Sequence, residues 1–348
     1  MKILFFIHGL YGGGAERVAS ILLNHFCEKH ETYVAVTNFK APFYPIDSRV
    51  HLIDDRKKIK GARFIPRFIK MAHTIHKIKP DIIISFLVTR NNKALAANLF
   101  CRRRIIVSER NTLKHERSLK HRFLRKLLYP LADKIVFVTA DDCKKYPFQN
   151  KCLTIYNPAI YSIYSDYSNR QKTIITIAPH NRWHSKGLDI LLKVWAKIAP
   201  QNPDWDLKIY GKIYYELPDN LIYLNHKRVI WSGWTDNIVE ILQKTSIFIL
   251  ASRFEGCPNS LIEAMSQGCA CLGTDCEGGI KEIITDGVDG LIAKSENIDD
   301  IAEKLQTLID DEGLRRKLSA GATEKVKQFD KNAFFDKWDK LIEEVAKK

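Results

Sequence analysis

Residues 247–265 read Ile-Phe-Ile-Leu-Ala-Ser-Arg-Phe-Glu-Gly-Cys-Pro-Asn-Ser-Leu-Ile-Glu-Ala-Met, which is an apolar run, a turn and the opening of a helix. A short apolar run that ends at a Gly/Pro turn is typical of a buried parallel strand feeding a loop and then a helix. In open α/β sheets, ligands bind at the carboxyl ends of the strands. The segment therefore predicts an α/β fold with a ligand site in the loop after residue 251.

Two glutamates lie eight positions apart in this segment. Glu255 falls in the expected loop and Glu263 in the expected helix, so they flank the unpaired N–H groups of a helix N-terminus. Such N–H groups favour a phosphate. Ser260 and Glu263 also match a capping box, which gives Glu263 a structural alternative. Glu255 has no comparable structural role, so the pair favours function.

Strand-like runs alternate with helical patterns along the whole chain. The runs are Ile3–Ile7, Tyr33–Val36, Asp81–Ser85, Arg104–Val107 and Lys134–Thr139, then Ile174–Ala178, Leu207–Tyr210, Val229–Ser232, Ile247–Ala251 and Cys269–Gly273. This alternation predicts parallel sheets covered by helices on both faces, and 348 residues suggest two domains. We expect domains at 1–165 and 170–330, joined by a polar linker, and a helix at 331–348 that packs back toward the first domain.

The hydrophobic runs and the cysteines indicate where the protein is located and whether it binds a metal. The longest apolar run is strand-length, well short of the roughly 18 residues that span a bilayer, and the N-terminus lacks the features of a signal peptide. We therefore expect a cytoplasmic protein. Its eight cysteines show no Cys-x-x-Cys pair and no zinc-like His spacing, so they are expected to be reduced thiols that bind no metal.

Charge is unevenly distributed along the chain. Residues 1–165 hold 30 of the 55 Lys and Arg residues but only 12 of the 40 Asp and Glu residues, whereas the remainder is slightly acidic. A basic first half indicates nucleic acid, an anionic membrane or a polyanionic substrate as its partner.

Two further loops carry residues suited to binding a diphosphate. Gly12, Gly13 and Gly14 follow the first strand and open a helix, but they lack the Gly-x-Gly-x-x-Gly spacing of a dinucleotide site. Arg182 and Lys186 follow the strand Ile174–Ala178, so two cations lie at its carboxyl end. Solvated loop charges and a tight turn are the ordinary alternatives.

These motifs, in this order, resemble glycosyltransferase family 4. The likeness includes Gly12 to Arg17, the loop of Arg182, Lys186 and Gly187, the spacing from Glu255 to Glu263, and the run from Gly278 to Ile292. It implies the GT-B fold, in which two Rossmann-like domains face each other across a cleft. It also implies retaining transfer of a sugar from a nucleotide donor.

The resemblance also implies roles for individual residues. Glu255 would bind the donor hexose, Glu263 the ribose hydroxyls, and Arg182 and Lys186 the diphosphate, which makes Glu255, Lys186 and Arg182 the candidate catalytic residues. Further donor contacts would come from Gly13, Gly14, Gly256 and the backbone N–H groups of Asn259, Ser260 and Leu261. No metal or other cofactor is expected, since cations and a helix N-terminus can stabilise the departing diphosphate.

The basic first half suggests where the acceptor binds. Leu119, Phe123 and Leu127 share one helical face, flanked by Lys120, Arg122, Arg125 and Lys126. A second basic stretch from Arg63 to Lys79 has the same kind of pattern. Two basic amphipathic helices in one basic domain predict an anionic membrane surface as a partner. By resemblance, the helix at 119–129 could hold the diphosphate of a polyprenyl-linked acceptor, and Glu109 and Arg110 stand where related enzymes have Glu-His.

The resemblance leads us to expect a retaining transferase that moves a hexose or N-acetylhexosamine from a nucleotide donor to a polyprenyl-diphosphate saccharide or another surface-glycan precursor. The family favours a UDP-linked donor, and the sequence leaves a GDP-linked donor open. The enzyme would act as a peripheral protein on the inner face of the cytoplasmic membrane. One alternative is a GT-B sugar-nucleotide epimerase, which leaves the basic helices unexplained. The other is a non-catalytic nucleic-acid-binding protein; we expect no nucleic acid, since the two glutamates would repel phosphates.

Overall fold

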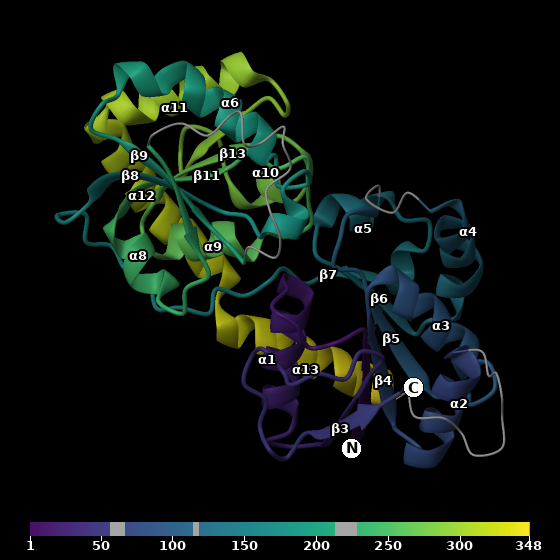
Figure 1. The fold of residues 1–348 in the computed structure, drawn as a ribbon. Coiled ribbons are helices and arrows are strands. Elements are labelled where there is room, and N and C mark those ends of the chain that lie inside the picture. Colours follow the sequence, from purple (N-terminus) through teal and green to yellow (C-terminus); the bar gives the residue numbers. More distant parts are fainter. Residues whose placement is uncertain (56–66, 114–117, 213–227, 348) are drawn as a thin grey trace. The chain divides into compact units, whose positions relative to one another are not determined.

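The computed structural model describes residues 1–55, 67–113, 118–212 and 228–347. The chain forms two compact units (Figure 1). The first consists of residues 1–157 and 332–348, and the second of residues 158–331. Each unit is a parallel sheet with helices packed on it, so the α/β class and the two Rossmann-like units predicted from the sequence are confirmed.

The first unit has a seven-stranded sheet in the order β3-β2-β1-β4-β5-β6-β7, with parallel pairings throughout. Its elements are β1 (Lys2–Ile7), α1 (Gly14–Phe26), β2 (Glu31–Val36), β3 (His51–Asp54), α2 (Arg67–Ile78), β4 (Ile82–Phe86), α3 (Val88–Asn98), β5 (Arg104–Ser108), α4 (Leu119–Leu128), β6 (Lys134–Phe137), α5 (Ala140–Lys145) and β7 (Cys152–Thr154). Alternate residues of β1 face the two sides of the sheet, so Phe5 packs in one apolar core and Phe6 in the other.

The C-terminal helix α13 (Lys331–Ala346) belongs to the first unit. Its buried Phe334 and Trp338 share a core with Phe5 and Phe86 from the sheet, and the Trp338 ring lies edge-on to Phe86. The unit therefore combines segments from both ends of the chain.

The second unit has a six-stranded parallel sheet in the order β10-β9-β8-β11-β13-β15. Its elements are β8 (Gln171–Ile177), α6 (Leu188–Ile198), β9 (Asp206–Tyr210), β10 (Val229–Gly233), α8 (Ile238–Lys244), β11 (Thr245–Leu250), β12 (Phe254–Glu255), α9 (Asn259–Ser266), β13 (Ala270–Thr274), β14 (Glu277–Gly278), α10 (Ile280–Ile283), β15 (Leu291–Ala293), α11 (Ile298–Asp310) and α12 (Glu312–Lys325). The ten strands predicted from the sequence are all present. The structure adds β3, β7, β12, β14 and β15, which are too short to give a clear apolar run.

The boundary between the units comes earlier than the expected linker. Ala159 N–H donates to the Phe329 carbonyl at 2.7 Å, and Tyr164 N–H donates to the Ser266 carbonyl at 2.8 Å. Residues 158–165 are thus tied to the second unit, although their polar composition resembles a linker.

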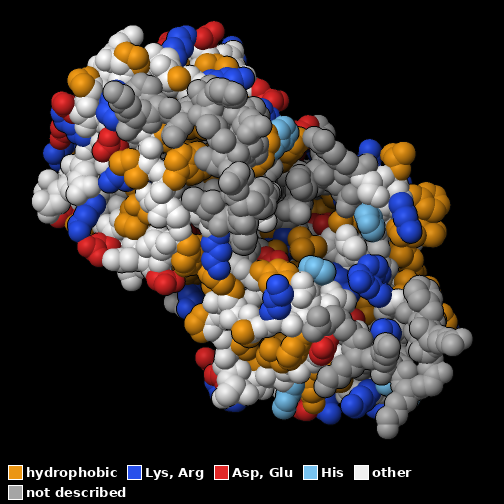
Figure 2. All heavy atoms as spheres, viewed as in Figure 1, with side chains coloured by type: hydrophobic (Ala, Val, Ile, Leu, Met, Phe, Trp, Pro, Cys, Tyr) orange, Lys and Arg blue, Asp and Glu red, His pale blue; other side chains and the backbone are white. Residues whose placement is uncertain are grey.

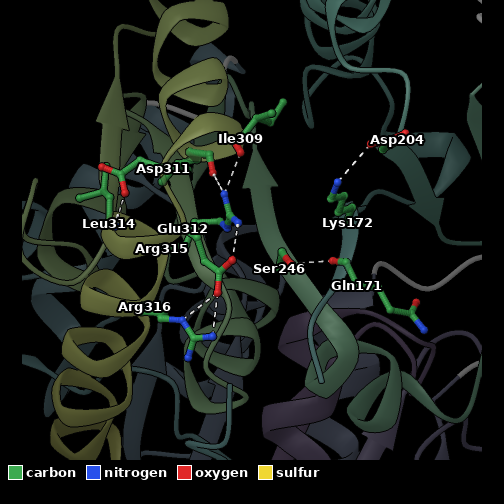
Figure 3. A network of polar contacts seen from close by, with 11 residues as sticks. Gln171, Lys172, Asp204, Ser246, Ile309, Asp311, Glu312, Leu314, Arg315 and Arg316 are labelled. Carbon is green, nitrogen blue, oxygen red and sulfur yellow. Dashed lines mark hydrogen bonds and ion pairs between the residues drawn. The ribbon is translucent and has the colours of Figure 1, made fainter. Parts of the chain in front are cut away.

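Polar contacts fix the amino ends of the second sheet, away from the strand ends where ligands are expected. Arg315 on α12 donates to the carbonyls of Leu308 and Ile309 at 2.6 and 2.8 Å, and Ser246 donates to the Gln171 carbonyl at 2.6 Å (Figure 3). The Arg315 contacts satisfy carbonyl groups in the last turn of α11, and the Ser246 contact joins the start of β11 to the start of β8. These residues therefore stabilise the unit at this end of the sheet.

Both sheets have a topological switch point. In the first sheet, β1 and β4 are neighbours, but the strands that follow β1 and those that follow β4 are added on opposite sides of this pair. In the second sheet, β8 and β11 are related in the same way. Loops that follow such neighbouring strands diverge and leave a crevice at their carboxyl ends. A functional site is therefore expected after β8 and β11 in the second unit, and after β1 and β4 in the first.

Candidate functional site

The loops after β8 and β11 bring Lys186 and Glu255 together. Lys186 Nζ lies 2.6 Å from Glu255 Oε1, and the two side chains are only 9% and 7% exposed. The Ser252 hydroxyl donates to the same oxygen at 2.7 Å. None of the residues that the structure describes donates to Glu255 Oε2. The carboxylate is thus held through one oxygen, and the other is available to a ligand hydroxyl.

Gly187 allows the two loops to approach each other. Its φ is +62°, and a Cβ at this position would lie 1.9 Å from the Ala251 carbonyl oxygen. Only glycine accommodates both the left-handed backbone and this contact. The Lys186-Gly187 pair therefore combines a functional cation with the residue that lets its loop pack on the end of β11.

Arg253 ties the same loops together. Its guanidinium forms two hydrogen bonds of 2.8 Å with Asp189 and donates to the His184 carbonyl, and its backbone N–H donates to the Ser185 carbonyl. Burial disfavours the charged form of Asp189, but the hydrogen bonds and charge of Arg253 outweigh it and lower the pKa of this carboxyl. Arg253 and Ser252 could not be predicted from the sequence, because a loop arginine or serine carries no local pattern.

A small two-stranded sheet fixes the Glu255 loop from the other side. β12 pairs with β14, and Gly279 N–H donates to the Gly256 carbonyl at 2.8 Å. Burial, followed by the charge of Glu255, raises the pKa of the nearby Cys276 thiol to about 12. This thiol is therefore a packing group at the edge of the site.

Helix α9 begins at Asn259, with Pro258 at the N-cap, so Ser260 lies inside the first turn. The capping box considered for Ser260 and Glu263 is therefore wrong, because a capping serine must stand outside the helix. Glu263 is only 6% exposed. The N–H of Leu261 donates to the Pro258 carbonyl at 3.1 Å, and its contact with a phosphate stays a prediction.

The remaining residues predicted to bind the donor are Arg182, Gly13 and Gly14, which lie in two different segments of the chain. Arg182 ends a short 3-10 helix (His180–Arg182) one turn before Lys186, and its side chain is exposed. Gly13 and Gly14 lie in the first unit, and their role toward a donor stays a prediction.

In the first unit, a buried polar cluster follows β5. Tyr129 donates its hydroxyl to Glu109, and Arg125 Nη1 lies 3.9 Å from the same carboxylate. Burial, then the neighbouring Glu109, raises the pKa of Tyr129 well above its usual value. Arg110 is also buried, and it donates to Asn157. The expectation that Arg125 lies on an exposed basic face is wrong, because its guanidinium points inward to Glu109.

The other acceptor candidates on α4 are exposed. Leu119, Phe123 and Leu127 are 78%, 66% and 60% exposed, and they alternate with the exposed cations Lys120, Arg122 and Lys126. Figure 2 shows apolar and basic side chains side by side along the edge of the first unit where α4 lies. This face of α4 is thus both apolar and basic.

Helix α2 differs from α4, although both have apolar residues at helical spacing within a basic sequence. Met71, Ile75 and Ile78 of α2 are buried in the core of the first unit. Its apolar stripe is therefore an ordinary core face, and the inference that both helices present membrane-binding faces is wrong for α2. The part of the predicted stretch before Arg67 lies outside the described residues.

The chain is similar to known glycosyltransferases. Residues 165–325 match the family model "Glycosyl transferases group 1". The chain is 28% identical to the Campylobacter jejuni enzyme GalNAc-alpha-(1->4)-GalNAc-alpha-(1->3)-diNAcBac-PP-undecaprenol alpha-1,4-N-acetyl-D-galactosaminyltransferase, over 99% of both chains. It is 40% identical to another C. jejuni protein, N,N'-diacetylbacillosaminyl-diphospho-undecaprenol alpha-1,3-N-acetylgalactosaminyltransferase, over 37% of this chain and 34% of that one. The fold is similar to that of Anabaena HepE in complex with UDP, with a TM-score of 0.81, 17% identity, and coverage of 99% of this chain and 100% of that one.

Proposed function

We propose that this chain, a glycosyltransferase with the GT-B fold, is a family 4 enzyme that transfers an N-acetylhexosamine from a UDP-linked donor to a polyprenyl-diphosphate-linked saccharide. The observation that carries the proposal is the buried Lys186–Glu255 pair at the switch point of the second sheet. Relatives named as N-acetylgalactosaminyltransferases favour N-acetylgalactosamine within the hexose and N-acetylhexosamine class. The donor is UDP-linked in this proposal because a solved structure of similar fold holds UDP.

The donor would lie along the carboxyl ends of β8 and β11. Lys186, with the exposed Arg182, neutralises the diphosphate, and the first turn of α9 adds N–H donors at Asn259 and Ser260. Glu255 accepts a hydrogen bond from a sugar hydroxyl through Oε2, and the buried Glu263 binds the ribose hydroxyls. In this arrangement the donor would add its contacts to the pair that Lys186 and Glu255 already form.

The proposed reaction breaks the bond between the anomeric carbon and the diphosphate oxygen, and forms a bond from that carbon to an acceptor hydroxyl oxygen on the same face. The hydroxyl proton leaves with the nucleoside diphosphate. Positive charge develops on the sugar ring, where the Glu255 carboxylate stabilises it. Negative charge develops on the diphosphate, where the Lys186 ammonium stabilises it. The preorganised pair undergoes little rearrangement during this step.

A lipid-linked acceptor requires access to a membrane surface, which α4 would supply. Its exposed Leu119, Phe123 and Leu127 can enter the headgroup region while Lys120, Arg122 and Lys126 contact anionic lipids. Among the helices in the described ranges, none is both long enough and apolar enough to cross a bilayer. The exposed apolar and basic face of α4 leads us to propose peripheral attachment at the inner face of the cytoplasmic membrane.

The donor assignment is tested with a panel of nucleotide sugars. We expect UDP-N-acetylhexosamines to raise the melting temperature and GDP-linked sugars to leave it unchanged. Incubation with a polyprenyl-diphosphate saccharide should then add one N-acetylhexosamine mass, with an α linkage by NMR. Interconversion of two nucleotide sugars without an acceptor product would support the epimerase alternative instead.

The role of α4 predicts two separable effects on vesicle binding. Reversing the exposed charges with Arg122→Glu and Lys126→Glu should weaken binding to anionic vesicles mainly at low salt, since each cation contributes about 1 kcal/mol near the surface. Replacing Phe123 with serine should weaken binding at all salt concentrations, because it removes apolar contact. Co-sedimentation with phosphatidylglycerol vesicles measures both.

The control for this experiment is Lys144→Glu, an exposed cation on α5 of the same unit. Arg125 is left unchanged because it is paired with Glu109. If the α4 variants bind vesicles as tightly as this control, α4 is not the membrane contact.

A further inference from the structure

His8 lies at the switch point of the first sheet. It follows β1 directly, and its carbonyl accepts hydrogen bonds from the N–H groups of Thr37 and Asn38, at 3.1 and 2.9 Å, just after β2. The backbone of His8 is thus fixed between the carboxyl ends of two neighbouring strands, while the residue is exposed. This is the edge of the sheet at which ligands bind in such folds.

The hydroxyl of Thr37 determines which imidazole nitrogen of His8 carries the proton. This hydroxyl donates its one proton to the His8 carbonyl at 3.1 Å, and the same oxygen lies 2.9 Å from His8 Nδ1. A hydroxyl that has already donated can only accept, so Nδ1 is the donor of the second contact. The tautomer is assigned from this hydrogen-bond pattern, and in the neutral ring it leaves a lone pair on Nε2.

The surroundings of His8 favour the neutral ring. Partial burial lowers the pKa of His8 below its ordinary value of 6.5. The positive charges of Arg90, Arg67 and Lys93 lower this pKa further, because they oppose a second proton on the imidazole. Within the described parts of the chain, no residue forms a hydrogen bond with Nε2. His8 therefore presents an uncharged hydrogen-bond acceptor at neutral pH.

Aromatic rings lie in the loops beside His8. The Tyr11 ring is edge-on to the imidazole, with centroids 6.1 Å apart. The Phe43 ring lies against Gly12, where a Cβ would be 3.2 Å from the ring. Neither ring belongs to the apolar cores on the two faces of the sheet. Aromatic faces next to a few polar groups are typical of ligand sites, and they suit a sugar, which has C–H faces and hydroxyl edges.

We propose that His8 Nε2 accepts a hydrogen bond from a hydroxyl of the acceptor saccharide, with the Tyr11 ring beside that sugar. This inference rests on the proposed function and adds a residue that positions the acceptor. An uncharged lone pair suits a sugar hydroxyl, whereas a fully ionised diphosphate has no proton to donate to it. The donor sugar is assigned to Glu255 in the second unit, so the first unit is left to supply the contacts of the acceptor.

Two substitutions separate the two nitrogens of His8. His8→Asn keeps an amide near the position of Nδ1, beside Thr37, but removes the acceptor at Nε2. His8→Gln places an amide oxygen near the position of Nε2. Both side chains are uncharged, so a difference between the variants does not come from charge.

The probe is a farnesyl-diphosphate-linked disaccharide that ends in N-acetylgalactosamine, tested with the full chain by calorimetry and by transfer kinetics. We expect its dissociation constant and KM to rise about five- to tenfold in His8→Asn and to stay within about twofold of wild type in His8→Gln. The value of kcat should change little, because the contact is present before and during the reaction. Equal acceptor affinity in the two variants would overturn the proposal.

The control is His76→Asn, which removes an exposed imidazole in the last turn of α2. Its acceptor affinity should stay within about twofold of wild type, as expected for a side chain away from the strand ends. UDP-N-acetylgalactosamine and UDP should each bind His8→Asn as tightly as they bind wild type. A loss confined to the sugar nucleotide would mean that His8 contacts the donor sugar, which contradicts the assignment to the acceptor.

Acceptors that each lack one sugar hydroxyl identify the group that contacts His8. One of them should bind wild type about five- to tenfold less tightly than the intact acceptor, yet bind His8→Asn as well as the intact acceptor does. If every missing hydroxyl weakens binding to wild type and His8→Asn by the same factor, no hydroxyl contacts His8 and the proposal is wrong.

Thr37→Val keeps the test open if His8→Asn fails to fold. It retains the imidazole but removes the hydroxyl that fixes its tautomer, so acceptor affinity should fall, and Thr37→Ser should restore it. Equal affinity in these two variants would overturn the proposal. Failure of the proposed function would appear as absence of transfer by wild type, whereas failure of this inference leaves wild-type transfer intact, so the two are distinguishable.

Discussion

Replacing Glu255 with glutamine is expected to reduce sugar transfer by about 100- to 1000-fold. Glutamine keeps an acceptor oxygen near the Ser252 hydroxyl but removes the negative charge that opposes the developing positive charge on the sugar. The loss should appear in kcat more than in KM, because this interaction is stronger in the transition state than in the bound donor. Steady-state kinetics with the donor identified from the nucleotide-sugar panel measures it.

Replacing Glu255 with alanine has a second consequence that only the structure reveals. From the sequence, this loop glutamate has no structural role. In the folded protein its removal leaves the buried Lys186 ammonium without its partner, which costs about 3–5 kcal/mol of unfolding free energy. Urea unfolding measures this cost. The double replacement Lys186→Met with Glu255→Leu should recover much of the stability while transfer stays lost.

A matched control is available in the same unit. Glu240 and Lys244 on α8 form an ion pair of the same length, 2.6 Å, but their side chains are 52% and 51% exposed. Breaking an exposed pair with Glu240→Gln should cost less than about 1 kcal/mol and leave transfer unchanged. If folded Glu255→Gln protein turns over within tenfold of the Glu240→Gln control, Glu255 is not the donor contact proposed.

Replacing Gly187 with alanine is expected to destabilise the second unit by about 3–4 kcal/mol. The left-handed backbone alone costs an L-residue roughly 1–2 kcal/mol. The new methyl would also stand 1.9 Å from the Ala251 carbonyl oxygen, which is backbone and cannot rotate away. The loops after β8 and β11 would have to separate, so transfer should fall together with stability.

The variant Gly233→Ala measures the free-energy cost of a left-handed backbone at an L-residue without a steric clash. Gly233 also has a left-handed backbone, with φ of +67°, but a Cβ there meets nothing within 4 Å. We expect this control to lose only about 1–2 kcal/mol. Equal losses of unfolding free energy in the two variants would show that the contact between Gly187 and β11 is not restrictive.

Local sequence patterns predicted the loops that carry the candidate site but not the contacts between their side chains. The apolar runs located β8 and β11, and the loops after them contained Lys186 and Glu255, because carboxyl strand ends carry ligands in this class of fold. The pairing of the two side chains across 69 residues could not be predicted, since it depends on which strands become neighbours. Arg253 and Ser252 were missed for the same reason.

Helices α2 and α4 show where sequence periodicity stops being informative. Both have an apolar stripe within a basic helix, and the sequence led us to treat them alike. Met71 and Ile75 of α2 are fully buried, whereas Leu119 and Phe123 of α4 are mostly exposed. Periodicity shows that a helix has an apolar face but does not show what covers that face.

The sequence by itself determined the α/β class, the two sheets, the charge asymmetry and the loop positions of Lys186 and Glu255. All of these depend on local patterns or on composition. The tertiary structure alone decided that Lys186 and Glu255 form a buried pair, that Arg125 turns inward, and that the apolar face of α4 is exposed. The physical reason is that burial and charge proximity depend on which distant segments pack together, and packing is a property of the whole fold.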